Sequence, residues 1–231
     1  MRYRALACDY DGTLATEGRV EQECIAALER LKASGRKLVL VTGRQLEDLS
    51  EIFPERNLFD WIVAENGALI YCPETAQEQL IGKPPPPEFV EELEKRGVFP
   101  SVGRIIVATR EPHGATVGHV IHDLDLDVQI ILNKGAVMVL PAGVNKATGL
   151  QHALSDLGLS PHDAVGIGDA ENDLDFLSVC AYAVAVANAL PFLKERVDYV
   201  TRGERGAGVI ELIDKIIAGG LQERGSRPIK S

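Results

Sequence analysis

The sequence has few cysteines, no long hydrophobic run and fewer basic than acidic residues. Its four cysteines, at positions 8, 24, 72 and 180, form no C-x-x-C pair, so we expect buried free thiols in a reducing cytoplasm. No stretch approaches the ~18 apolar residues of a membrane span, and the first residues lack the apolar segment of a signal peptide. Lys and Arg number 24 against 34 Asp and Glu, a net charge of −10, which argues against sequence-independent binding of nucleic acid and against attachment to an anionic membrane.

The composition is that of an ordinary globular protein. Of the 231 residues, 45% are hydrophobic and 25% are charged, which suits a substantial core in one large or two unequal domains. Short apolar runs alternate with segments of helical periodicity, which indicates an α/β fold. Strands are expected at residues 5–8, 37–41, 61–64, 68–71, 104–109, 128–132, 136–140, 164–167, 181–186 and 199–200. Helices are expected at residues 21–34, 46–53, 88–96, 112–124, 146–157, from 174, at 191–196 and at 209–217.

Four successive prolines, residues 84–87, interrupt this pattern. They favour a stiff extended segment that continues neither a helix nor a central strand, so they indicate a domain boundary. Beyond them a small αβαββ unit ends at residues 141–143, after which the α/β pattern resumes. We therefore expect a core of residues 1–83 and 142–218, an inserted α+β domain of residues 84–141, which we call the insert, and a flexible tail of residues 219–231.

Two carboxylates lie where the first expected strand ends. Asp9 follows the apolar run 5–8, and Asp11 lies in the loop that Gly12 and Thr13 open. Open α/β sheets bind ligands at this edge, so Asp9 is a candidate nucleophile and Asp11 a candidate proton donor to a leaving group. An ordinary acidic turn is the alternative, because Asp and Gly are common turn residues.

Three later sites also lie at strand ends or helix starts. The Thr42 hydroxyl and the Gly43 N–H could hold a phosphate oxygen, and Lys146 could neutralise both a substrate phosphate and the candidate nucleophile. Asp169 and Asp173 are four residues apart at a loop-to-helix junction, so both could face one point. The alternatives are a Thr-Gly turn, a surface lysine and helix capping.

The acidic residues predict a bound cation. The two carboxylates after the first strand and the pair Asp169 and Asp173 would converge, and at ~4 Å each like-charge pair costs about 4 kcal/mol at an effective dielectric constant of 20. An oxygen ligand set without His or Cys selects a hard cation. Mg²⁺ fits best, because it takes few protein ligands and keeps its other positions for water and phosphate.

These residues carry a resemblance to a known family. In chain order, the segments that resemble the four motifs of the haloacid-dehalogenase-like phosphatases are Asp9-x-Asp11-Gly12-Thr13, Thr42-Gly43-Arg44, Lys146 and Gly168-Asp169-x-x-Asn172-Asp173. The turn of residues 65–68, the segment 187–189 and the position of the insert are similar to the Cof-type (subclass IIB) subfamily. That subfamily is similar in turn to archaeal phosphoglycolate phosphatases and to sucrose-phosphate phosphatases. The resemblance covers residues 1–83 and 142–218, and the insert is small for a Cof-type cap.

The resemblance implies a Rossmann-like parallel-sheet core with a small inserted α+β cap. It implies that Asp9 attacks phosphorus in line and forms an aspartyl-phosphate, while Asp11 protonates the leaving alcohol and then activates water. The implied metal ligands are Asp9, the carbonyl of Asp11 and Asp169, with Asp173 in support. The implied phosphate-binding residues are Thr42, Gly43, Lys146 and Asn172. Arg44 matches the subfamily, and its contact with substrate is left open.

We therefore expect a cytoplasmic, Mg²⁺-dependent phosphomonoesterase that acts on a small phosphorylated metabolite, such as a sugar phosphate or a phosphoglycolate-like ester. We expect the protein to be a monomer or a homodimer and to have no nucleic-acid or membrane partners. The alternatives are a phosphotransferase or mutase of the same superfamily and a non-catalytic binding module. Binding alone needs neither a nucleophile nor an acid, so the two carboxylates after the first strand speak against the module. The insert is expected to select the substrate without contributing an essential chemical group. Its candidate substrate contacts, which the sequence does not rank, are Arg104, Arg110, His113, Asn133 and Lys134.

Overall fold

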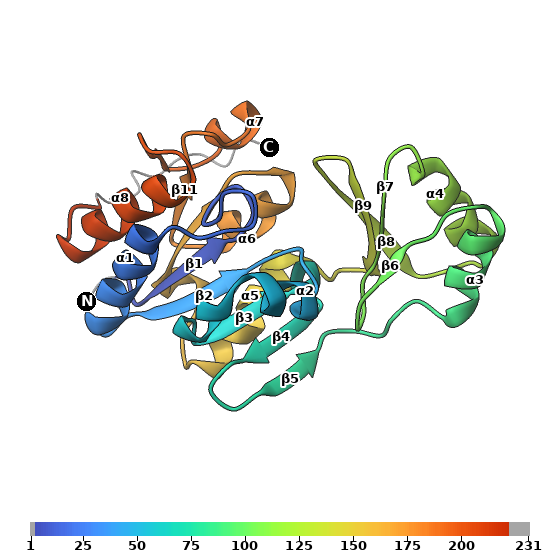
Figure 1. Ribbon diagram of the computed structural model, residues 1–231, viewed down its shortest axis with the longest axis horizontal. Coiled ribbons are helices and arrows are strands. Elements are labelled where there is room, and N and C mark those ends of the chain that lie inside the picture. Colours follow the sequence, from blue (N-terminus) through green and yellow to red (C-terminus); the bar gives the residue numbers. More distant parts are fainter. Residues whose placement is uncertain (1–2, 222–231) are drawn as a thin grey trace.

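The computed structural model describes residues 3–221, which form two sheets with helices packed on them (Figure 1). In spatial order, the strands of the large sheet are β12 (Tyr199–Val200), β11 (Tyr182–Ala185), β10 (Ala164–Gly168), β1 (Ala5–Asp9), β2 (Lys37–Val41), β3 (Trp61–Ala64), β4 (Leu69–Cys72) and β5 (Gln77–Leu80). Those of the small sheet are β6 (Ser101–Val102), β7 (Val107–Arg110), β9 (Ala136–Pro141) and β8 (Val128–Asn133). The α/β class expected from the sequence is confirmed.

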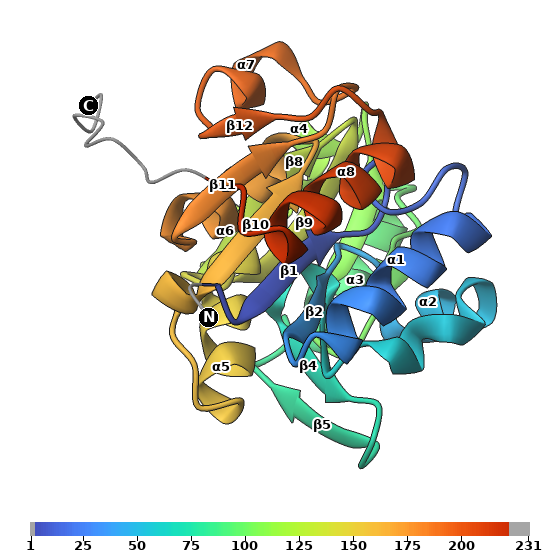
Figure 2. The ribbon, with the colours of Figure 1, turned by 90° about the vertical axis from the view of Figure 1, so that its left-hand side faces the viewer.

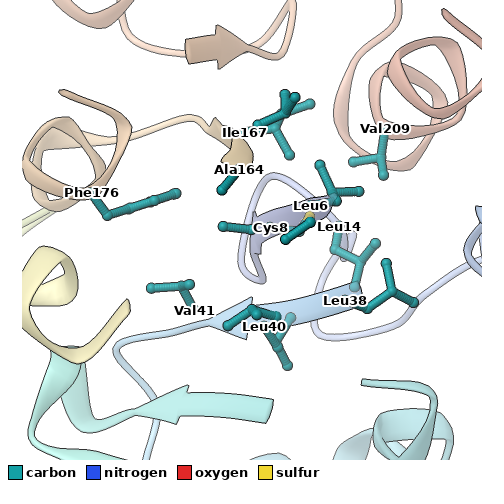
Figure 3. Packing of buried hydrophobic residues seen from close by; sticks show 14 of the residues in the cluster. Leu6, Cys8, Leu14, Leu38, Leu40, Val41, Ala164, Ile167, Phe176 and Val209 are labelled. Carbon is teal, nitrogen blue, oxygen red and sulfur yellow. The ribbon is translucent and has the colours of Figure 1, made fainter. Parts of the chain in front are cut away.

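Strand β1 is the centre of the large sheet. It pairs in parallel with β10 on one side and with β2 on the other, and all five of its residues are buried. Parallel strands covered on both faces are expected to be continuous apolar runs, and the runs at 37–41 and 61–64 are β2 and β3 as predicted. Figure 3 shows side chains of the central strands, among them Leu6, Leu38 and Ile167, gathered in the main core.

Helices cover both faces of the large sheet (Figure 2). Helices α1 (Gln22–Ala33) and α8 (Arg205–Ile217) lie side by side on one face, and α5 (Lys146–Asp156) and α6 (Leu174–Val179) lie on the other. The remaining α-helices are α2 (Leu46–Ile52), α3 (Pro87–Lys95), α4 (Gly114–Asp123) and α7 (Pro191–Lys194). The short 3₁₀ helices are η1 (Pro54–Leu58), η2 (Glu65–Gly67), η3 (Pro161–Asp163) and η4 (Glu171–Asp173).

The small sheet belongs to the insert and has a core of its own. Helices α3 and α4 pack on it through a cluster that includes Phe89, Val117 and Val139. A second cluster, with Ile106 and Met138, joins the sheet to residues of the core. In Figure 1 the insert lies beyond the arrowheads of β1 and β2, and two linkers connect it to the core. On this basis we propose that the insert is a cap over the carboxyl edge of the large sheet.

Several elements differ from the sequence-based expectations; the helix expected at 209–217, for example, already begins at Arg205 as α8. The edge strand β5 and the short strand β6 were not expected, and the insert is therefore αββαββ rather than αβαββ. Strand β5 is largely polar and exposed, so hydrogen bonds to β4, and not a buried apolar face, hold it in place. The strand expected at 104–109 begins only at Val107, because the preceding backbone N–H groups bind the Glu65 side chain instead of a neighbouring strand.

All four cysteines are free, as expected; three are buried and Cys72 is half-buried. Across residues 3–221, every helix is too short or too polar to cross a membrane. The flexible tail predicted for residues 219–231 lies, from position 222 onward, outside the described residues.

Candidate active site

Four of the predicted site residues meet at one edge of the large sheet. Asp9 is the last residue of β1, Thr42 follows β2, and Asp169 follows β10. Because β1 lies between β2 and β10, the carboxyl ends of the three parallel strands are neighbours. Lys146 is the first residue of α5, whose N-terminus is fixed by the Asn145 side chain, which accepts two backbone N–H groups of the first turn at 3.0 Å each.

Lys146 is buried at the base of this site. Its side chain is 1% exposed, and Nζ donates hydrogen bonds to Oδ1 of Asp9 and to Oδ1 of Asp173, each at 2.6 Å. A surface lysine, the alternative left open by the sequence, is thereby excluded. The ammonium links a residue at the end of β1 to one in η4, so it holds the two carboxylates at a fixed separation.

Burial perturbs the proton affinities of this cluster. Burial and then the Asp173 carboxylate raise the pKa of Asp9 to about 8, against the opposing effect of Lys146. Burial disfavours the charged form of Lys146, but the carboxylates of Asp173 and Asp9 outweigh it and raise the pKa of that ammonium. Burial also raises the pKa of Asp169. Further positive charge at this point would favour the ionised carboxylates.

Replacing Lys146 by Met is expected to destabilise the protein strongly. The substitution keeps the side chain as far as Cε but leaves two buried carboxylates without their cation, which costs about 3–5 kcal/mol in the free energy of unfolding. Urea unfolding of the variant measures this loss. The matched control is Lys37→Met, which removes a half-exposed ion pair with Asp60 (2.8 Å) and should cost under about 1 kcal/mol. Equal losses for both variants would contradict the prediction.

The side chains of Asp169 and Asp173 have different hydrogen-bond partners and therefore different roles. Both side-chain oxygens of the buried Asp173 are occupied, since Oδ1 accepts from Lys146 while Oδ2 accepts the backbone N–H groups of Asp169 (2.8 Å) and Ala170 (3.0 Å). Oδ2 of Asp169 accepts a hydrogen bond from Lys134 of the insert at 2.6 Å, whereas its buried Oδ1 has no partner among residues 3–221. The capping role considered for Asp173 is therefore present, and Asp169 has an oxygen left for a ligand.

Three carboxylates, and not the four expected, form a potential metal site. One oxygen each of Asp9, Asp169 and Asp173 lie within 4.8 Å of one another, and all three residues are buried. Asp11 is directed elsewhere: Nε and Nη2 of Arg44 donate to its two carboxylate oxygens, both at 2.7 Å. Because Asp11 lies in the loop beyond β1, its half-exposed side chain meets the arginine that follows β2.

The residues predicted to bind phosphate lie around the same point. Gly43, Lys146 and Asn172 line the site, whereas Thr42 is buried behind it and its hydroxyl accepts the N–H of Arg44 at 3.1 Å. Nδ2 of Asn172 donates to the side chain of Asn66 at 2.9 Å. The structure thus brings the four residues to one place, with Thr42 as a support of the loop that carries Gly43.

A cleft of about 810 Å³ lies between the core and the insert. Its core wall includes Asp9, Asp11 and Asp169. Of the insert residues that the sequence left unranked, those in its wall are Arg110, His113, Asn133 and Lys134. Arg104 lies outside it and pairs with Glu47 (2.8 Å) and Glu78 (3.4 Å).

Glu65 connects the insert to the core, and the sequence analysis identified it only as part of a turn. Its fully buried carboxylate accepts the backbone N–H groups of Arg104, Ile105 and Ile106 at 2.7 to 2.9 Å. Its own N–H donates to the carbonyl of Arg44, so the same turn contacts the loop after β2. Glu65 has a left-handed backbone, with φ of 48°. Residues 65–67 all have positive φ, and a non-glycine residue directly before Asn-Gly indicates a constrained turn. The local sequence does not indicate which backbone groups the Glu65 side chain binds.

Comparison with protein families agrees with this geometry. Residues 6–102 and 106–213 match the model of the haloacid dehalogenase-like hydrolases. The chain belongs to this family. The phosphoglycolate phosphatase of Methanothermobacter thermautotrophicus is 31% identical over 224 residues, which are 93% of this chain and 99% of that relative.

Solved structures of the family share the fold. A haloacid dehalogenase-like hydrolase from Bacteroides thetaiotaomicron aligns with a TM-score of 0.79 at 20% identity, over 93% of this chain and 99% of the other. A sugar phosphatase of HAD subclass IIB aligns with a TM-score of 0.73 at 22% identity, over 94% and 100%. The predicted resemblance to Cof-type phosphatases of the haloacid dehalogenase-like family is confirmed, and the chain is a phosphatase.

Proposed function

We propose that this phosphatase is a Mg²⁺-dependent phosphomonoesterase that forms an aspartyl-phosphate on Asp9. The observation that carries the proposal is the buried Lys146 ammonium, which bridges Asp9 and Asp173 at 2.6 Å each beside the unpaired oxygen of Asp169. A binding module has no need for a nucleophile held in this way. A small phosphate monoester fits the proposal, and the curated relative named phosphoglycolate phosphatase supports a phosphoglycolate-like ester or a sugar phosphate.

The chain's own residues perform two transfers. In the first, an oxygen of Asp9 forms a bond to phosphorus, the bond from phosphorus to the ester oxygen breaks, and Asp11 gives its proton to the departing alkoxide. In the second, Asp11 takes a proton from water, the water oxygen attacks phosphorus, and the bond to Asp9 breaks to release inorganic phosphate. The N–H of Gly43, the amide of Asn172 and the Lys146 ammonium orient the phosphoryl oxygens.

The oxygen donors fit Mg²⁺. We propose that Asp9, the backbone carbonyl of Asp11 and Asp169 hold the ion and that Asp173, whose oxygens are both occupied, supports them. The buried, unpaired Oδ1 of Asp169 is the feature that favours a ligand. When bound, Mg²⁺ supplies positive charge to the phosphoryl oxygens.

A phosphate-release screen tests this function. The purified protein is incubated with Mg²⁺ and phosphoglycolate, sugar phosphates, nucleotides or p-nitrophenyl phosphate, and inorganic phosphate is measured. We expect turnover of small monoesters and trapping of phosphate on Asp9, detectable by mass spectrometry of the acid-quenched protein. Folded protein that releases phosphate from none of these esters would overturn the proposal.

The variant Asp11→Asn tests whether Asp11 is the acid that protonates the leaving group. We expect kcat/KM for alkyl phosphates to fall by about 10²–10⁴-fold, and that for p-nitrophenyl phosphate to fall much less, because nitrophenolate leaves without a proton. The comparison uses kcat/KM because it reports formation of the phosphoenzyme and not its hydrolysis. The Asn side chain still accepts a hydrogen bond from Arg44, so the loop should remain in place. Equal losses for the two kinds of ester would remove Asp11 from the acid role.

A further inference from the structure

Lys134 carries a positive charge from the insert into the active site. It lies in the two-residue turn between β8 and β9, and Nζ donates to Oδ2 of Asp169 at 2.6 Å. A carboxylate oxygen of Asp169 lies within 4.8 Å of one of Asp9. The ammonium therefore contacts a carboxylate that neighbours the proposed nucleophile, although its residue belongs to the proposed cap.

The backbone geometry of this turn does not require a lysine. Lys134 has a left-handed backbone with φ of 46°, and Gly135 follows with φ of 80°. Two-residue hairpin turns with positive φ favour Asn or Gly at the first position, so lysine makes this turn less stable than Asn would. Its presence is explained by the side chain, which reaches the cleft while its ammonium remains partly accessible at 45% exposure of the side chain.

The walls of the cleft differ in charge. The insert contributes Arg110 and Lys134 against a single acid, Glu111, whose carboxylate accepts the N–H of Gly114 at the start of α4 at 3.2 Å. The core wall has more acids than bases, and its bases, Arg44 and Lys146, are paired with carboxylates. An ester whose phosphoryl group binds at the core wall therefore places its leaving group against the wall formed by the insert, where basic residues outnumber acidic ones.

We infer that Lys134 determines specificity by binding a carboxylate on a short leaving group of the phosphate ester. The inference rests on the proposed function and narrows its substrates to phosphorylated short hydroxy acids rather than phosphorylated neutral sugars. An ammonium has three N–H donors, and Asp169 accepts one of them among the described residues, so two can reach a carboxylate. Because Nζ contacts Asp169, whose carboxylate neighbours that of Asp9, the substrate carboxylate must be only a few bonds from the ester oxygen.

The first test compares turnover of three esters with Mg²⁺: phosphoglycolate, its uncharged primary amide and p-nitrophenyl phosphate. For Lys134→Met we expect kcat/KM to fall about 10- to 100-fold for phosphoglycolate and less than about threefold for the other two. Lys134→Arg should retain most of the preference for the charged ester. Lys134→Asn should lose it while keeping the turn, so a folding defect does not explain the loss. The matched control is Arg104→Met, which removes a cation of the insert that pairs with the core outside the cleft.

Equal losses for all three esters, or no loss for phosphoglycolate, would overturn the inference. The second test needs no turnover: calorimetry compares binding of 3-phosphonopropionate with that of propylphosphonate, which lacks the carboxylate. The wild type should prefer the former about tenfold, and Lys134→Met should abolish the preference. Hydrolysis without this preference would refute the role of Lys134 alone, whereas a preference that depends on Lys134 without any hydrolysis would refute the proposed function alone. Neither preference nor hydrolysis would refute both.

Discussion

Asp9→Asn is expected to reduce phosphate release by about 10⁴-fold or more, to the detection limit, without loss of fold. The amide does not attack phosphorus, so the first transfer cannot begin. The Asn oxygen still accepts a hydrogen bond from Lys146, and the ion pair of Lys146 with Asp173 remains. Burial and Asp173 raise the pKa of Asp9, so loss of this charge should leave the melting temperature unchanged or slightly higher.

The control for this variant is Asp48→Asn. Asp48 lines the same cleft but has no part in the proposed chemistry, so its substitution should change kcat/KM by less than about threefold. Mass spectrometry must show that the introduced asparagine has not deamidated back to aspartate. Substantial turnover by intact Asp9→Asn protein would mean that another residue is the nucleophile, and the assignment of Asp9 would fail.

Removal of divalent ions is the second change with a large expected effect. Exhaustive treatment with a chelator should bring phosphate release to the detection limit, and Mg²⁺ should restore it. Ca²⁺ should bind and support turnover poorly, because the larger ion does not keep the octahedral geometry that Mg²⁺ requires of its ligands. Three buried carboxylates lie within 4.8 Å of one another, and only two of them, Asp9 and Asp173, are paired with the ammonium of the core, Lys146. The third, Asp169, has one oxygen without a partner among residues 3–221, which is why we expect a strong dependence.

Calorimetry of Mg²⁺ binding gives a readout without turnover. Asp169→Asn should weaken binding about 10-fold or more, because it replaces the carboxylate that has an unpaired oxygen. Asp48→Asn serves again as the control and should leave the affinity unchanged. Full activity after chelation, or unchanged Mg²⁺ affinity in Asp169→Asn, would contradict the proposed metal site.

The order of the core elements could be predicted from the sequence because each depends on local patterns. The apolar runs of β1, β2 and β3 are buried on both faces, and such strands need little more than their own residues to be identified. The position of Asp9 followed from the end of such a run. Lys146 was expected to neutralise Asp9, although its position at the start of a helix also fitted a surface lysine.

The partners of polar residues were decided by tertiary structure. Asp11 was expected to join the other carboxylates, but Arg44 binds it from the neighbouring loop. The start of β7 was misplaced because Glu65, about 40 residues away in the chain, takes the backbone N–H groups of the preceding residues.

The position of Lys134 in the active site also could not be predicted from the sequence. Sequence alone placed it among five insert residues without rank, and only the packing of the insert on the core brings its ammonium to 2.6 Å from Asp169. Apolar periodicity specifies which face of an element is buried, because burial depends on the spacing of residues along one segment. A hydrogen bond or ion pair depends instead on the distance and direction between two segments. Neither segment's own sequence contains this information, because the folding of the whole chain sets how the two segments are placed.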